Sequence, residues 1–269
     1  METIPVYLFV GFLEAGKARF IQETMEDTRF HKGEKTLILL CEEGEEELDP
    51  TKYTGGHVTI ETLDDEEDLT REKLESLHKK YGFERVVLEY NGMWPMDLLR
   101  DLKLPRSWGL YQAIHVIDGT TFEMYRTNMQ SMIVDMVTEA DMVLFNRCTP
   151  DMPLAGWKRS IRAANRMCEV VFEDERGEEL EVEDILPYSL DQESITLEDD
   201  DYGIWYIDIQ DHPERYTGKT ITFKAQAMTS LKLPKGTFIP GRNAMTCCVE
   251  DIRFFGFLCK YDRARSLRK

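Results

Sequence analysis

The segment Gly11–Arg19, which reads GFLEAGKAR, constrains the fold of this chain more than any other part of it. It follows an apolar run over residues 4–10, whose β-branched and aromatic side chains predict a buried strand. The spacing G-x-x-x-x-G-K between such a strand and a helix, here predicted over residues 17–27, is typical of a phosphate-binding loop. We expect these residues to contact the phosphates: Gly11, Glu14, Ala15, Gly16, Lys17, Ala18 and Arg19.

The chemistry of such a loop comes from its backbone and its lysine. Glycines allow backbone N–H groups to curl around phosphate oxygens, and the start of the helix adds partial positive charge. Lys17 would reach the β- and γ-phosphates. The next position usually carries a Ser or Thr hydroxyl that binds Mg²⁺, and Ala18 has none. The sequence therefore predicts phosphate binding with weak or absent Mg²⁺-dependent hydrolysis.

Apolar runs alternate with helical patterns along the next 150 residues or so. The predicted strands cover residues 36–41, 57–62, 85–89, 110–117, 141–145 and 169–173, and the predicted helices cover residues 68–80, 120–138 and 153–166. Strands that alternate with helices form parallel pairs joined by crossover connections. The predicted fold class is α/β, a P-loop NTPase-like, mostly parallel sheet with flanking helices.

The pattern changes after an acidic stretch over residues 173–201. The segments GIWYIDI, KTITFKAQAM, GTFIP and IRFFGFLCK then predict short strands separated by Gly, Pro and Lys turns. A small unit built only from strands suits an OB-like barrel. We predict a nucleotide-binding domain over residues 1–173, an acidic linker over residues 174–203 and a small all-β barrel domain over residues 204–269.

The charge of the chain excludes some partners. The formal net charge is −18, although residues 204–269 carry 12 basic and 6 acidic residues. So acidic a surface argues against nucleic acid as a partner, because duplex binding needs clustered basic side chains. No apolar stretch approaches the roughly 20 residues that span a bilayer, and the N-terminus lacks the basic region of a signal peptide. We expect a cytoplasmic protein that does not itself span a membrane.

Several motifs in the right order resemble those of the CobW-type P-loop GTPases, a family of metal-handling proteins. GFLEAGKAR resembles their phosphate loop, LLCEEGEEELD their acidic switch segment, and RVVLEYNGMWP their E-x-x-G stretch. HVIDGTTF followed by EADMVLFNR resembles the segments that close their nucleotide domain with a guanine-reading Asn. The resemblance covers about residues 3–172. It implies that GTP or GDP is the ligand.

The same resemblance assigns roles to four residues outside the loop. Asn146 and Arg147 match the positions that bind the base. Glu43 and Glu89 are the carboxylates expected near Mg²⁺ or the attacking water, and thus the catalytic candidates. The alternatives are a solvated acidic loop for Glu43 and a strand-end carboxylate without a catalytic role for Glu89.

The sequence departs from the family pattern in three places. Ala18 and Arg19 replace two threonines of the phosphate loop. The family's N-K-x-D is Asn-Arg-Cys-Thr here, and Thr149 cannot accept the two guanine hydrogen bonds that Asp would accept. The C-x-C-C metal motif is missing, because residues 55–60 contain no cysteine. The resemblance therefore does not imply metal transfer.

The C-terminal part resembles a domain of uncharacterised bacterial proteins that partner a predicted two-component permease. The shared elements are a Y-x-G-K strand start, the segment GRNAMTCC and the following apolar strand. A membrane permease or a metal-handling protein is the partner that this resemblance implies. Cys247 and Cys248 are candidate Zn²⁺ ligands, which would need Cys259 or His212 to complete a site. Alternatively both are buried core residues, since adjacent strand side chains point to opposite faces.

The function that the sequence favours is guanine-nucleotide binding with a regulatory or assembly role in metal or transport homeostasis. One alternative is a non-catalytic interaction protein whose nucleotide site is a relic. Another is an ATP-using kinase or ligase built on the same loop.

The cysteine pair yields a first test. If Cys247 and Cys248 are core residues, elemental analysis of the purified protein will find no stoichiometric zinc, and Cys248→Ala will act mainly by lowering stability. One zinc per chain that is lost from the double variant would establish the metal site instead.

Overall fold

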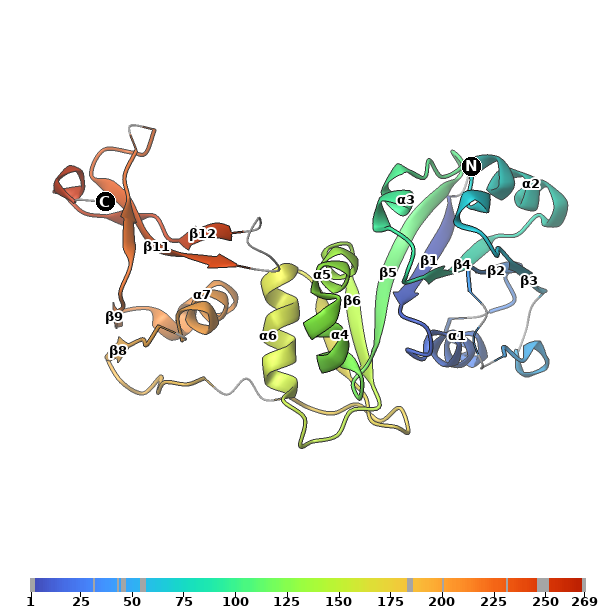
Figure 1. Ribbon diagram of the computed structural model, residues 1–269, viewed down its shortest axis with the longest axis horizontal. Coiled ribbons are helices and arrows are strands. Elements are labelled where there is room, and N and C mark those ends of the chain that lie inside the picture. Colours follow the sequence, from blue (N-terminus) through green and yellow to red (C-terminus); the bar gives the residue numbers. More distant parts are fainter. Residues whose placement is uncertain are drawn as a thin grey trace. The chain divides into compact units, whose positions relative to one another are not determined.

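The structure is a computed structural model that describes residues 3–30, 32–42, 44, 47–53, 57–182, 186–199, 201–230, 232–245 and 252–267. The chain divides into two compact units, whose elements are labelled in Figure 1. Unit 1 comprises Met1–Leu154 and Asn165–Val182, and unit 2 comprises Ala155–Ala164 and Glu183–Lys269.

Unit 1 is built on a sheet of seven strands in the order β3-β2-β4-β1-β5-β6-β7. All of its pairings are parallel. In chain order the strands are β1 (Ile4–Gly11), β2 (Thr36–Leu40), β3 (Val58–Thr62), β4 (Arg85–Asn91), β5 (Trp108–Asp118), β6 (Met142–Asn146) and β7 (Glu169–Phe172). The predicted fold class, a parallel sheet with flanking helices, is confirmed.

The helices of unit 1 follow the strands as a doubly wound fold requires. They are α1 (Lys17–Glu26), α2 (Arg71–Tyr81), α3 (Met96–Asp101), α4 (Phe122–Asn128) and α5 (Gln130–Thr138). The helix α6 (Leu154–Ala164) groups with unit 2 apart from its first residue. The sequence did not predict α3, a short helix that follows Pro95.

The core of unit 1 fixes α1 over the middle of the sheet. Ile21 and Met25 lie one helical turn apart on α1, and both are fully buried. They pack against Phe9 of β1, Ile38 of β2 and Val87 of β4. Figure 1 shows the long strand β5 running beside β1. Because all these strands run the same way, their carboxyl ends meet at the edge of the sheet where α1 begins.

Unit 2 contains an antiparallel sheet of β10 (Gln226–Met228), β11 (Thr237–Met245), β12 (Ile252–Gly256) and β13 (Cys259–Lys260). A separate parallel pair joins β8 (Ser194–Thr196) to β9 (Thr220–Thr222). Short strands in the C-terminal part were predicted, the structure shows that they pair in an antiparallel sheet, and their closure into an OB-like barrel stays a prediction.

One predicted strand is wrong. The segment GIWYIDI lies within the helix α7 (Asp201–Asp211). Its core-facing residues Tyr202, Trp205, Tyr206 and Ile209 recur at the spacing i, i+3, i+4 and i+7, which is the period of a helix. The prediction rested on β-branched and aromatic composition, and the burial pattern shows that periodicity was the better guide.

Within the described residues, no helix is long and apolar enough to cross a bilayer.

The domain boundaries predicted at residues 174 and 203 can be tested by limited proteolysis. The structure indicates which part of the predicted linker a protease should cut. The predicted linker includes β8, which is paired with β9, whereas Glu175 and Arg176 lie exposed in a turn. We expect a glutamate-specific protease to cut within residues 174–193 first and to leave two folded fragments, identified by mass spectrometry and circular dichroism. A single resistant core that spans this stretch would show that the chain is one cooperative unit.

Candidate functional site

The predicted phosphate loop lies between the end of β1 at Gly11 and the start of α1 at Lys17. Two of its residues have left-handed backbone conformations, Glu14 with φ 58° and Gly16 with φ 92°. Left-handed residues are a feature of the backbone nests that bind anions. Since a non-glycine residue rarely adopts such a conformation, Glu14 indicates that the surrounding contacts hold the loop in this shape.

Glycine is required where the loop meets its neighbours. A Cβ atom on Gly11 would lie 2.4 Å from the Val116 carbonyl oxygen, and one on Gly92 would lie 2.4 Å from the Gly11 oxygen. A Cβ atom on Gly16 would lie 2.3 Å from Nδ2 of Asn146. These distances are too short for any side chain, so the glycines allow β4, β5 and β6 to approach the loop closely.

The Lys17 side chain is folded back under the loop. It is 2% exposed, and its Nζ donates hydrogen bonds to the carbonyl oxygens of Gly11 at 2.8 Å and Phe12 at 3.0 Å. Its third contact is an ion pair and hydrogen bond with the carboxylate of Glu42, which follows β2. An ammonium has three protons, and these three acceptors match them.

Glu89, predicted from the E-x-x-G stretch, is close to this lysine. Its Oε1 lies 3.9 Å from the Lys17 Nζ, and the residue is 6% exposed on β4. Burial raises the pKa of Glu89 to about 7, a shift that Lys17 opposes and that the nearby carboxylates of Glu42 and Glu14 reinforce. A carboxyl group that titrates near neutral pH can gain or lose a proton at physiological pH.

The two predicted base-binding residues hold the opposite side of the loop. Asn146 ends β6, is 8% exposed, and donates from Nδ2 to the Ala15 carbonyl oxygen at 2.7 Å. Its Oδ1 is buried and, among the described residues, without a hydrogen-bond partner. Since a buried acceptor without a partner is costly, this oxygen is suited to receive a hydrogen bond from a ligand.

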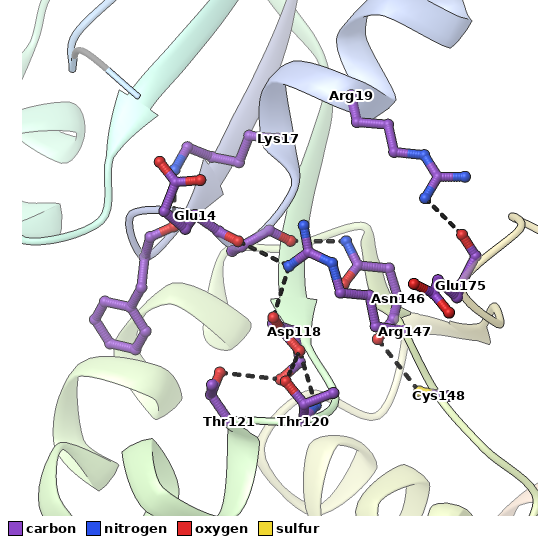
Figure 2. A network of polar contacts seen from close by, with 12 residues as sticks. Glu14, Lys17, Arg19, Asp118, Thr120, Thr121, Asn146, Arg147, Cys148 and Glu175 are labelled. Atoms are coloured by element: carbon purple, nitrogen blue, oxygen red, sulfur yellow. Dashed lines mark hydrogen bonds and ion pairs between the residues drawn. The ribbon is translucent and has the colours of Figure 1, made fainter. Parts of the chain in front are cut away.

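Arg147 follows with a left-handed backbone, φ 52°. Figure 2 shows its guanidinium between Glu14 and Asp118. Its Nη1 donates to the Glu14 carbonyl oxygen at 2.9 Å and to Oδ2 of Asp118 at 2.6 Å. Asp118 ends β5 and accepts from the backbone and hydroxyl of Thr120. The ends of β5 and β6 therefore brace the backbone of the phosphate loop.

Arg19 contacts the turn after β7. Its Nη1 donates to the Glu175 carbonyl oxygen at 2.8 Å and its Nε donates to Oε1 of Glu23 at 2.9 Å, and Figure 2 shows the first of these contacts. The guanidinium thus ties α1 to that turn, where a threonine would not reach.

A pocket of about 440 Å³ opens beside the loop, lined among others by Gly16, Lys17, Ala18, Glu42 and Glu89. The left-handed loop and its buried lysine fit a phosphate group. They do not complete a Mg²⁺ site, because Ala18 has no hydroxyl to offer. Nowhere in the described part of the chain do three or more His, Cys, Asp or Glu side chains form a group that could hold a metal ion.

The structure thus gathers the predicted loop residues with Glu89, Asn146 and Arg147. The other predicted site residues, Glu43, Cys247 and Cys248, lie outside the described residues. Two contacts were missed, those of Glu42 and Asp118. Asp118 ends β5 and Glu42 lies two residues after β2, so the rule that carboxyl ends of parallel strands meet at one edge indicates the region of both residues.

Comparisons with known proteins agree with this geometry. Residues 5–151 match the family model described as CobW/HypB/UreG, nucleotide-binding domain, and residues 172–269 match the DUF1980 C-terminal domain. The two resemblances suggested by the sequence are confirmed by these matches. A comparison with curated proteins finds no match.

Similar folds occur among solved structures. The Zn(II)-bound YjiA GTPase from E. coli is 21% identical with a TM-score of 0.46, and the match covers 63% of this chain and 57% of that one. The hydrogenase maturation factor HypB from Archaeoglobus fulgidus is 14% identical with a TM-score of 0.43, with coverages of 65% and 82%. The chain thus spans less than two thirds of the YjiA length.

The raised pKa of Glu89 predicts a stability that depends on pH. Because the folded protein binds this proton more tightly than the unfolded chain, its free energy of unfolding should fall as pH rises from about 4.5 to 7. Glu89→Gln should remove that decline, which amounts to about 3 kcal/mol at most. Urea unfolding at pH 5 and pH 8 measures it.

Glu61→Gln is the matched control. The hydrogen bond from Tyr81 lowers the pKa of Glu61 below its ordinary value of 4.5, so Glu61 is ionised at both pH 5 and pH 8 and this variant should lose the same stability at both. If the wild-type protein and Glu89→Gln show parallel pH curves, Glu89 is not protonated as described.

Proposed function

The chain belongs to the CobW/HypB/UreG family of nucleotide-binding domains, and on this basis we propose that unit 1 binds a guanine nucleotide, GTP or GDP. The observation that carries the proposal is the loop Gly11–Lys17 with Asn146 and Arg147 bonded to its backbone. One set of contacts shapes the loop and also places two residues of the family's base-reading motif beside it.

In this proposal different residues bind the phosphates and the base of the nucleotide. The backbone N–H groups of the loop bind the phosphates, and Lys17 neutralises their charge once it is released from its own chain. The free Oδ1 of Asn146 accepts a hydrogen bond from the base. Thr149 stands where an Asp would accept two more, so we propose that guanine is only modestly preferred.

Hydrolysis is proposed to be weak or absent. In related loops the hydroxyl that follows the lysine binds Mg²⁺, and Ala18 supplies none. Glu89 could activate a water only in its deprotonated form, and its raised pKa leaves much of it protonated at neutral pH. A bound nucleotide would then act as a structural signal more than as a substrate.

The wider role is proposed from the pairing of the two matched regions. A CobW-type nucleotide unit and a DUF1980-type unit in one chain support a regulatory or assembly role in metal or transport homeostasis. We propose a cytoplasmic protein whose partner is a membrane permease or a metal-handling protein.

One observation favours a second function. All three hydrogen bonds of the Lys17 ammonium are made to acceptors of its own chain. A lysine that is satisfied in this way needs no ligand, as would be expected of a non-catalytic interaction protein with a relic nucleotide site.

Titration calorimetry with GDP, GTP and ATP, with and without Mg²⁺, tests the proposal. We expect weak binding and a GTP-over-ATP preference below about a hundredfold, since each lost charged hydrogen bond to the base is worth about 1–3 kcal/mol. Ala18→Thr should increase the dependence on Mg²⁺ because it restores the missing hydroxyl.

Lys17→Ala should abolish binding, and Lys79→Ala, which removes an exposed lysine of α2, should not. Sub-micromolar, guanine-exclusive, Mg²⁺-dependent binding by the unmodified protein would contradict the expected defects. No binding of any nucleotide, with Lys17→Ala unchanged in every assay, would favour the interaction protein.

A further inference from the structure

The carboxylate of Glu42 forms an ion pair and a hydrogen bond with the Lys17 ammonium beside the phosphate loop. Its side chain is 7% exposed and pairs with an ammonium that is 2% exposed. The other two acceptors of Lys17 are backbone carbonyl oxygens of Gly11 and Phe12, which belong to the loop itself. Glu42 is therefore the partner that can leave while the loop stays intact.

We propose that Glu42 is an internal competitor for phosphate at Lys17, so that a nucleotide must displace this carboxylate before its phosphates reach the ammonium. This inference rests on the proposed nucleotide site and names how that site is regulated. It makes Glu42 the residue that sets how tightly the site binds its ligand.

In this exchange the buried Lys17 ammonium has a negatively charged partner both before and after the ligand binds. Removing one partner of a buried ion pair is strongly destabilising, because the remaining charge has lost both water and its counter-ion. Lys17 avoids that cost in the empty site through Glu42, and in the loaded site through a phosphate. Glu42 regains hydration when it leaves, so the contact acts as a competitor that ligand concentration can overcome.

The segment that carries Glu42 is fixed at both ends. The Cys41 N–H donates to the Glu89 carbonyl oxygen at 2.9 Å, which holds the chain on β4. At the other end, the Asp49 N–H donates to Oε1 of Gln22 at 2.9 Å and its carbonyl oxygen accepts from Nε2 of Gln22 at 3.2 Å. The contacts of Cys41 and Asp49 do not involve the Glu42 carboxylate, so its release from Lys17 need not break them.

The test compares GDP binding and thermal unfolding of the wild-type protein and Glu42→Gln. The variant should bind GDP about tenfold or more tightly, because it removes a charged hydrogen bond that GDP must otherwise break. Its ligand-free form should unfold at a lower temperature, since Lys17 has lost its closest counter-ion and keeps only Glu89 at 3.9 Å. Opposite changes in affinity and stability separate competition from a structural role, which would lower both.

Three further variants define the result. Glu47→Gln removes the same charge from an exposed residue of the same pocket, so it measures the general electrostatic effect and should give a much smaller gain. Glu42→Asp keeps the charge on a shorter side chain and should be intermediate, which also covers the case that Glu42→Gln does not fold. Lys17→Ala with Glu42→Gln should lose the gain.

The outcomes are distinct. Wild-type protein that binds GDP, with Glu42→Gln no tighter than wild type, would overturn this inference and leave the proposed function standing. No binding of GDP or pyrophosphate by either protein would overturn both. Binding by Glu42→Gln alone would support both and show how strongly the carboxylate competes.

Discussion

The Lys17 ammonium is almost completely removed from water, and groups at the ends of three strands lie around it. A buried charge must find hydrogen bonds and a counter-ion within the protein. Lys17 finds them in carbonyl oxygens at the end of β1, in Glu42 after β2 and in Glu89 on β4. The strand order β2-β4-β1 places these groups side by side. The same groups make the pocket anionic, so a phosphate chain enters only by exchange for a carboxylate.

The side of the loop that faces β5 and β6 is held by contacts of another kind. There the loop backbone is held by neutral and charged donors from Asn146 and Arg147, and Arg147 in turn is held by Asp118. These contacts do not involve Lys17, so they hold this part of the loop backbone independently of the partner that the ammonium has. A loop that is already shaped loses little conformational entropy when it binds a ligand. In the proposed function the departures from the family pattern therefore concern the metal and the base, and the loop backbone keeps the shape that a phosphate needs.

The sequence predicted the sheet well because buried parallel strands are short apolar runs, as in residues 4–10 and 85–89. It also predicted the phosphate loop, because two glycines and a lysine at that spacing after a strand are typical of such a loop. It failed for α7, where aromatic side chains at helical spacing resembled a strand. It also predicted Glu43 as a site carboxylate, a residue that lies outside the described residues, and it did not predict the pairing of Glu42 with Lys17. The rule that strand ends meet at one edge indicates this region, but past the end of β2 no periodicity tells which side chain of the acidic segment contacts Lys17, so the folded chain was needed to identify Glu42. The cysteine pair stays a prediction.

The central claim is that Lys17 exchanges its own carboxylate for a phosphate. A crystal structure at saturating GDP tests this directly, because both partners of the exchange can be seen at once. The account predicts a diphosphate in the loop between Gly11 and Lys17, its β-phosphate on the Lys17 Nζ, and Glu42 moved away from it. A diphosphate bound elsewhere, or a Lys17–Glu42 pair that stays intact beside a bound nucleotide, would contradict it.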